Sequence, residues 1–244
     1  MSLPPLTFNA WLRFGLINRM LRGLQGIQTV LEIGGGEGAL GARLARRFDY
    51  VGLEPDDRSF AKAKARVDEV GRGTVIHGDL SALDPSATFD LVCAFEVLEH
   101  IEEDASALAE WRERLRPGGW LLLSVPAHPQ RYGPWDRWAG HYRRYERAQL
   151  SALLASGGFT DVQVWAYGFP LGYLLEWARD RIAARDGPRR SMAERTAASG
   201  RRFQPADGLG WLTCGVSAPF RLVQRPFTST ELGTGLVARA RRPE

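Results

Sequence analysis

The sequence predicts an α/β fold with a doubly wound, mostly parallel sheet and a C-terminal helical or loop lid. Short apolar segments alternate with helical segments between residues 28 and 126, and the first apolar segment runs into a glycine-rich loop. Alternating strands and helices indicate a parallel sheet covered on both faces. The 244 residues, of which 44% are hydrophobic, suffice for one core with an appended segment.

Local patterns indicate each element in turn. Residues 8–24 have apolar side chains at helical spacing and are expected to form a leading helix. Pro117 and Gly118 end a helix and turn the chain into the fifth strand. Short apolar runs indicate strands at residues 29–33, 50–54, 73–77, 89–95, 120–125, 161–167 and 235–240. Amphipathic runs indicate further helices at residues 40–48, 58–70, 105–115, 146–156 and 171–184.

Composition narrows the classes of function. The net charge of +4 is small and its basic excess is concentrated in residues 179–202, whereas a nucleic-acid-binding protein usually has a denser basic stripe. No nucleic-acid partner is therefore expected. The longest uncharged run, residues 208–220, is shorter than the ~20 residues that span a bilayer, and no signal peptide is recognisable. We expect a cytoplasmic protein without a transmembrane segment, with Cys93 and Cys214 as free thiols.

The loop after the first strand is the first functional motif. Gly34 and Gly36 allow a tight turn and a close approach of a ligand to the backbone, and the following helix presents free amide groups. Gly34, Gly36 and Ala39 also satisfy the dinucleotide-binding pattern, in which Glu54, about 20 residues further on, would bind a ribose. The glycines alone therefore leave two classes of cofactor open.

Two carboxylates favour one of these classes. Glu32 places a negative charge beside the loop, which is unfavourable for a pyrophosphate but favourable for a cationic amino-acid ligand. Asp79, after the third strand, adds a hydrogen-bond acceptor where the amino group of an adenine would lie. An NAD(P)-linked oxidoreductase is therefore the alternative hypothesis and not the first one.

Six motifs in this order resemble those of the class I S-adenosylmethionine-dependent methyltransferases, in particular the subgroup of ubiquinone-type and other small-molecule methyltransferases. They are the Glu32-x-Gly34-x-Gly36-x-Gly38 loop, Glu54, Gly78-Asp79, Phe89-Asp90, Glu96-Val-Leu-Glu-His100 and Leu115-Arg-Pro-Gly-Gly119. The resemblance implies a Rossmann-like fold in four parts. These are an N-terminal helix at 1–26, a cofactor-binding core at 27–168, a helix and lid insertion near the substrate at 169–228, and a final strand of the core sheet at 229–244.

The same resemblance implies a site for the methyl donor S-adenosylmethionine. Glu32 would lie near its amino group, Glu54 would accept hydrogen bonds from both ribose hydroxyls, and Asp79 would accept one from the adenine. Phe95 and Glu96 would flank the methyl group. For Asp79, a helix N-cap remains the alternative. The residues implied to bind the cofactor are Glu32, Gly34, Gly36, Glu54, Pro55, Asp79, Leu80, Phe95, Glu96 and His100.

Residues 125–145, after the fifth strand, are rich in aromatic side chains and histidines, which suits an organic substrate. His128 and His141 are candidate general bases, because a hydroxyl acceptor gains from removal of its proton. The alternative for both is a histidine hydrogen-bonded to backbone in a packed loop, and for His100 a packing role. His128, Asp136 and His141 lack the compact spacing of metal ligands, so no metal site is expected.

Together these features predict an enzyme that transfers a methyl group from S-adenosylmethionine to a small-molecule acceptor, preferably at oxygen, by in-line displacement. The basic residues 179–202 would suit an anionic or lipid-linked acceptor. Residues 187–210 contain glycines, arginines and few large apolar side chains, and are expected to form a mobile lid. A cofactor-binding module without catalysis is a third hypothesis.

Overall fold

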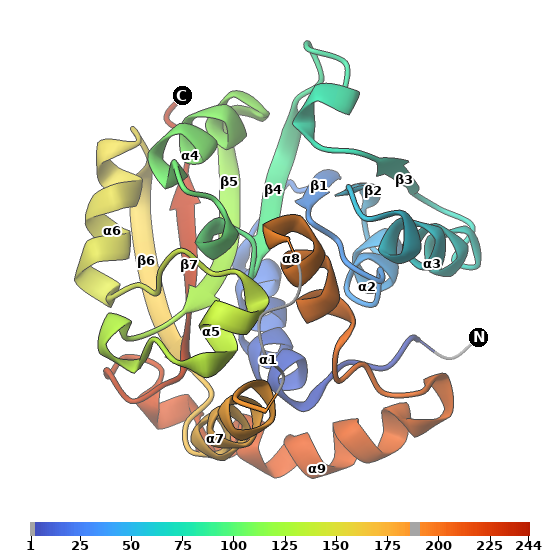
Figure 1. Cartoon of the computed structure of the whole chain (residues 1–244). Helices are drawn as coiled ribbons and strands as arrows, with labels where there is room; N and C mark the ends of the chain where they lie inside the picture. Colours follow the sequence, from blue (N-terminus) through green and yellow to red (C-terminus); the bar gives the residue numbers. More distant parts are fainter. Residues whose placement is uncertain (1–2, 186–190) are drawn as a thin grey trace.

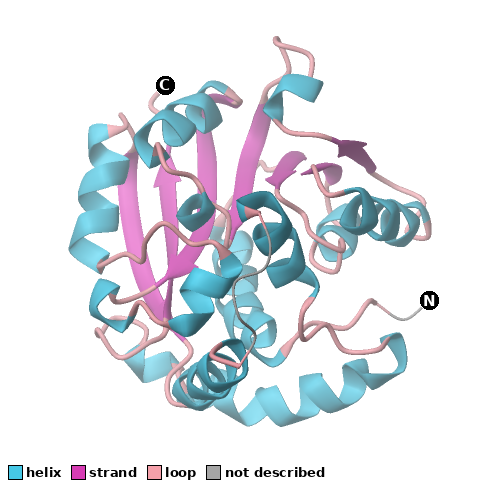
Figure 2. Ribbon diagram, viewed as in Figure 1, coloured by secondary structure: helices cyan, strands magenta, loops and turns pink. Residues whose placement is uncertain are grey.

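The computed structural model describes residues 3–185 and 191–244. They contain a seven-stranded sheet in the order β3-β2-β1-β4-β5-β7-β6, with helices around it (Figures 1 and 2). Strands β1 to β5 are parallel, and β7 is antiparallel to both β5 and β6. The predicted doubly wound, mostly parallel sheet is confirmed. The strands are β1 (Thr29–Ile33), β2 (Asp49–Glu54), β3 (Thr74–His77), β4 (Phe89–Phe95), β5 (Leu115–Pro126), β6 (Thr160–Tyr167) and β7 (Gly235–Arg241).

Two apolar clusters cover the two faces of the sheet. On one face, Leu108 and Trp111 of α4 and Leu150 of α6 pack against the strands. On the other, Leu12 of α1 and Val67 of α3 do so. These four helices therefore present an apolar stripe to the sheet, as their periodicity predicts. The helices are α1 (Phe8–Gly23), α2 (Gly41–Ala45), α3 (Asp57–Asp68), α4 (Asp104–Glu113), α5 (Pro134–Ala139), α6 (Arg147–Ser156), α7 (Leu171–Ala183), α8 (Met192–Arg201) and α9 (Gly210–Val223).

One predicted boundary needs correction, and three helices were not predicted individually. The fifth strand was expected to begin after the Pro117-Gly118 turn, but β5 begins at Leu115 and runs through it. Gly118 takes a φ of +74° there, and its amide donates to the Arg242 carbonyl at 3.1 Å. Helices α5, α8 and α9 were not predicted individually, and α8 lies within the segment expected to form a helical or loop lid. Gly187 and the Arg189-Arg190 pair of that lid lie outside the described residues.

Helix α8 begins at a capping box. The Ser191 hydroxyl accepts a hydrogen bond from the Glu194 amide at 3.3 Å, and the Glu194 carboxylate accepts one from the Ser191 amide at 3.0 Å. This reciprocal pair satisfies amides that the first helical turn would leave unbonded. The helix contacts α5 and so lies beside the segment that follows β5 (Figure 1).

Within residues 3–185 and 191–244, none of the helices combines the length and apolar character needed to cross a membrane. Cys93 is buried and Cys214 is partly buried, and both are free thiols, as predicted.

Candidate active site

A cavity of about 1070 Å³ opens where the strand order reverses between β1 and β4. Crevices at such a reversal, at the carboxyl ends of parallel strands, are the usual ligand sites of this architecture. The lining comes from the start of α1, the loop after β1, the end of β2, the segment after β4, and helices α7 and α8. The cavity therefore lies between the sheet and the segments appended to it.

The glycine loop is held in place by the carboxylate of Glu54. Its two oxygens accept hydrogen bonds from the amides of Gly36, at 2.7 Å, and Asp56, at 2.9 Å. Gly34 has a φ of +68°, and a Cβ there would lie 2.7 Å from a methyl group of Val97. Only glycine satisfies both the backbone and the spacing at this position.

Glu32 is a buried carboxylate at the end of β1. Its side chain lines the cavity, is 3% exposed and accepts a 2.6 Å hydrogen bond from the Tyr50 hydroxyl. Burial raises the pKa of Glu32 to about 7, although the Tyr50 hydrogen bond lowers it. A cationic group of a ligand would favour the ionised carboxylate.

Glu96 follows β4 and has a φ of +59°. Its carboxylate forms an ion pair with Arg13 at 3.0 Å and accepts hydrogen bonds from the hydroxyls of Ser124, at 2.8 Å, and Tyr167, at 3.2 Å. Burial opposes ionisation, but the charge of Arg13, the Ser124 hydrogen bond and other nearby positive charges together outweigh it, so the pKa of Glu96 lies below its ordinary value. Glu96 is therefore an ionised group whose charge is matched inside the protein.

The structure brings most of the predicted cofactor residues together. Asp79 and Leu80 are outside the cavity lining. Asp79 instead caps the short helix Leu80–Ala82, where its carboxylate accepts hydrogen bonds from the Ser81 amide at 2.9 Å and hydroxyl at 2.7 Å. An adenine contact for Asp79 and Leu80 stays a prediction. The predicted residues that line the cavity are Glu32, Gly34, Gly36, Glu54, Pro55, Phe95, Glu96, His100 and His141.

The two candidate bases have different surroundings. His128 is not among the cavity-lining residues, and its Nε2 lies 2.9 Å from the carbonyl oxygen of Gly233. His141 is 8% exposed and lines the cavity, with Nδ1 2.7 Å from a carboxylate oxygen of Asp136. An ionised carboxylate can only accept, so Nδ1 carries a proton, and in the neutral ring the lone pair lies on Nε2. Of the two histidines, only His141 is placed to act on a molecule in the cavity.

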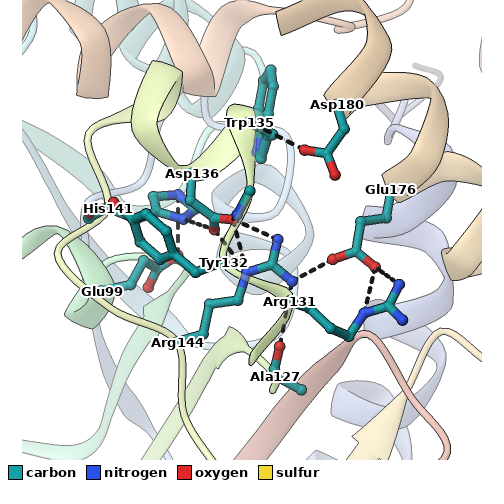
Figure 3. A network of polar contacts seen from close by, with 11 residues as sticks. Glu99, Ala127, Arg131, Tyr132, Trp135, Asp136, His141, Arg144, Glu176 and Asp180 are labelled. Atoms are coloured by element: carbon teal, nitrogen blue, oxygen red, sulfur yellow. Dashed lines mark hydrogen bonds and ion pairs between the residues drawn. The ribbon is translucent and has the colours of Figure 1, made fainter. Parts of the chain in front are cut away.

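A buried ionic network supports His141 from behind (Figure 3). Arg144 donates to Asp136 through Nε, at 2.9 Å from each carboxylate oxygen, and through Nη2 at 2.6 Å. It also pairs with Glu176 of α7, which in turn pairs with Arg131. Burial raises the pKa of Asp136, but the hydrogen bonds from His141 and Arg144 outweigh it and hold that pKa well below its usual value.

Three residues of the cavity have no individual assignment from the sequence. Arg13 lies on the predicted leading helix, Arg179 begins the basic stretch 179–202 that would suit an anionic acceptor, and Glu99 belongs to the Glu96-Val-Leu-Glu-His100 motif. All three line the cavity. The signal for Glu99 was present in the sequence, because Glu99 and His100 are adjacent in the short segment that follows a buried strand.

Comparison with known proteins decides the family. A family model described as a methyltransferase domain matches residues 12–164. The chain belongs to this methyltransferase family. The match covers most of the sheet and the candidate site, so the resemblance to S-adenosylmethionine-dependent methyltransferases predicted from the motifs is confirmed.

Two relatives agree with this membership. The chain is 38% identical over 140 residues to a probable S-adenosylmethionine-dependent methyltransferase of Mycolicibacterium smegmatis, a match over 54% of this chain and 52% of the relative. It is 32% identical over 177 residues to a ubiquinone biosynthesis O-methyltransferase of Paramagnetospirillum magneticum, over 64% of this chain and 68% of the relative. The chain thus spans about half the length of the first relative.

Solved structures of distant methyltransferases share the fold. The N-methyltransferase NodS from Bradyrhizobium japonicum, in complex with S-adenosyl-L-homocysteine, superimposes with a TM-score of 0.59 at 17% identity, over 95% of this chain and 86% of that one. Phosphoethanolamine N-methyltransferase 2 of Haemonchus contortus, in complex with S-adenosyl-L-methionine, has a TM-score of 0.59 at 16% identity, and the match covers 95% of this chain and 53% of that one. At these identities the similarity concerns the fold alone.

Proposed function

We propose that this protein transfers a methyl group from S-adenosylmethionine to the oxygen of a small-molecule acceptor. The observation that carries the proposal is the position of Glu54. Its carboxylate braces the glycine loop through the Gly36 amide and lines a cavity at the strand-order reversal of a methyltransferase fold. The relative named as a ubiquinone biosynthesis O-methyltransferase supports oxygen as the acceptor atom.

The cofactor would occupy the part of the cavity bounded by the glycine loop. Gly34 and Gly36 would contact its methionine part, and Glu32 would lie near its ammonium group. Glu54 and Pro55 would contact the ribose, because both line the cavity at the end of β2. Asp79 and Leu80 would reach the adenine, and Phe95 and Glu96 would lie near the methyl group.

The methyl donor supplies an electrophilic carbon, so the protein has to align the acceptor, exclude water and remove a proton. His141 is the residue that we assign to activating the acceptor hydroxyl. Asp136 fixes its ring so that Nε2 presents a lone pair. We assign no such role to His128, whose Nε2 lies beside the Gly233 carbonyl.

The proposed acceptor carries a negative charge. Arg13 and Arg179 both line the cavity. The guanidinium of Arg13 is matched by Glu96, but Nε of Arg179 is buried without a hydrogen-bond partner among the described residues. An anionic group of the acceptor would satisfy this nitrogen, and buried donors are usually satisfied.

Binding of S-adenosylhomocysteine to Glu54→Ala tests the cofactor site. Loss of a charge-assisted contact to both ribose hydroxyls should cost roughly 2–3 kcal/mol, or about 30- to 150-fold in affinity by calorimetry. Glu69→Ala is the matched control, because Glu69 is exposed and is not among the cavity-lining residues. If Glu54→Ala binds within threefold of wild type, the assignment is wrong. Turnover of a panel of anionic phenols and alcohols with labelled S-adenosylmethionine then tests the transfer itself.

A further inference from the structure

Three potential metal ligands meet at the wall of the cavity. One ligand atom each from Glu99, His100 and His141 lies within 4.8 Å of the other two. Glu99 and His100 belong to the short helix Leu98–His100 after β4, and His141 follows α5. All three residues line the cavity. The fold therefore brings a carboxylate and two imidazoles to one point from segments that are far apart in the sequence.

Among the residues that the structure describes, no hydrogen bond accounts for the burial of the Glu99 carboxylate. Its side chain is 0% exposed, and neither carboxylate oxygen has a hydrogen-bond partner within residues 3–185 and 191–244. The nearest ring nitrogen of His141 is 4.0 Å away, beyond hydrogen-bond distance (Figure 3). An unpartnered buried carboxylate is strongly unfavourable. A cation between these groups would remove that penalty.

His141 is oriented as metal-binding histidines are. Its Nδ1 donates to Asp136 at 2.7 Å, and Asp136 is fixed by Arg144 at 2.6 Å. In metal sites, a histidine ligand commonly donates its second N–H to a carboxylate in this way, which sets the tautomer and strengthens the ligand. The Nε2 lone pair of His141 is thereby directed towards Glu99.

His100 supplies the second imidazole. Its ring is perpendicular to that of His141, with the centroids 4.7 Å apart. Its Nδ1 lies 3.2 Å from the hydroxyl of Thr196, which connects α8 to the cluster.

We propose that Glu99, His100 and His141 bind a first-row divalent cation such as Mn²⁺ or Zn²⁺. Two imidazoles and one carboxylate suit such ions better than Mg²⁺ or Ca²⁺, which prefer oxygen ligands. Three protein ligands leave coordination positions open towards the cavity, as in catalytic metal sites. This assignment replaces the expectation of no metal that the spacing of His128, Asp136 and His141 suggested.

The role of the cation rests on the proposed methyl transfer, whereas the site itself does not. An acceptor hydroxyl on the cation would lose its proton to water near neutral pH, because a divalent cation lowers the pKa of a bound O–H group. The oxygen would then form its bond to the methyl carbon as the carbon–sulfur bond breaks, and the donor would leave as S-adenosylhomocysteine. His141 would thus activate the acceptor as a metal ligand and not as a free base.

Metal binding without cofactor or acceptor tests the site. Tag-free protein is first stripped of metal with a chelator. Mn²⁺ binding is then measured from the electron paramagnetic resonance signal of free Mn²⁺, and Zn²⁺ binding is measured by calorimetry. Wild type should bind one ion, and Mg²⁺ should bind at least tenfold more weakly. Glu99→Gln and His141→Ala should each weaken Mn²⁺ binding at least tenfold, and Asp136→Asn about 10- to 100-fold through His141.

His128→Ala is the matched control, since it removes a histidine outside the cluster and should bind Mn²⁺ within threefold of wild type. Thermal unfolding without metal reports whether each variant folds, and added Mn²⁺ should raise the melting temperature of wild type but not of Glu99→Gln. Wild type that binds neither ion, or Glu99→Gln that binds as tightly as wild type, overturns the proposal. If the protein binds the ion but transfers a methyl group to no acceptor, the proposed function is wrong, whereas the metal site stands.

Discussion

Arg144→Met should destabilise the protein more than loss of any surface ion pair. Arg144 is 4% exposed and makes three contacts of 2.6–2.9 Å with Asp136, which is 0% exposed. Removing one partner of a buried ion pair leaves an uncompensated charge and costs about 3–5 kcal/mol. Glu176 keeps Arg131 as a partner, so the penalty falls mainly on Asp136. For a chain of this size, the melting temperature should fall by roughly 6–20 °C.

Urea unfolding in the presence of a chelator measures this loss without any contribution from bound metal. Arg144→Lys should recover only part of it, because an ammonium group cannot reproduce the two-pronged contact with Asp136. Arg143→Met is the matched control, since the side chain of Arg143 is 33% exposed and its ion pair with Asp104 should contribute less than about 1 kcal/mol. A loss below about 1 kcal/mol for Arg144→Met would refute the reasoning.

Three further predictions follow from the cavity and its surroundings. Glu32 keeps its proton up to about pH 7 in the folded protein but only to about pH 4.5 when unfolded, so the free energy of unfolding of wild type should fall by about 3 kcal/mol relative to Glu32→Gln as the pH rises from 4.5 to 8. If urea unfolding gives the same pH dependence for both proteins, this prediction is wrong. Gly34→Ala should reduce S-adenosylhomocysteine affinity at least tenfold by calorimetry, whereas Gly26→Ala, with a similar φ but no atom within 4 Å of the added Cβ, should not. Ser191→Ala should cost about 1 kcal/mol of local stability and speed tryptic cleavage within α8, and unchanged cleavage would argue against the cap.

The sheet could be predicted from sequence because its signals are local. Strands β1 and β4 match the predicted ranges, since each is a short apolar run bounded by polar or glycine residues. Helix α1 also begins at the predicted residue. The capping box at Ser191 was an equally local signal for α8, but the composition of the segment favoured a loop. Helix α9 was missed because it contains Pro219 and two glycines.

The candidate site was only half predictable. The cofactor side consists of residues directly after strands, whose positions follow once the strands are known. The network around Asp136 does not follow in this way, because Arg144, which pairs with Asp136, also pairs with Glu176 of α7, a residue 32 positions further along the chain. His128 and His141 looked equivalent in the sequence, and only the tertiary contacts of each separate them.

Four glutamates lie at or just after the ends of β1, β2 and β4, and comparing them shows that the metal proposal rests on more than the presence of a carboxylate. Glu32 is satisfied by a tyrosine hydroxyl, Glu54 by two backbone amides, and Glu96 by a guanidinium and two hydroxyls. Among these four, Glu99 is the most deeply buried and has no hydrogen bond within the described parts of the chain. A protein that satisfies three neighbouring carboxylates internally has no physical reason to leave the fourth buried and unpaired. The imidazoles of His100 and His141 beside Glu99 are ligands that suit a divalent cation, and this is the partner that we propose for Glu99.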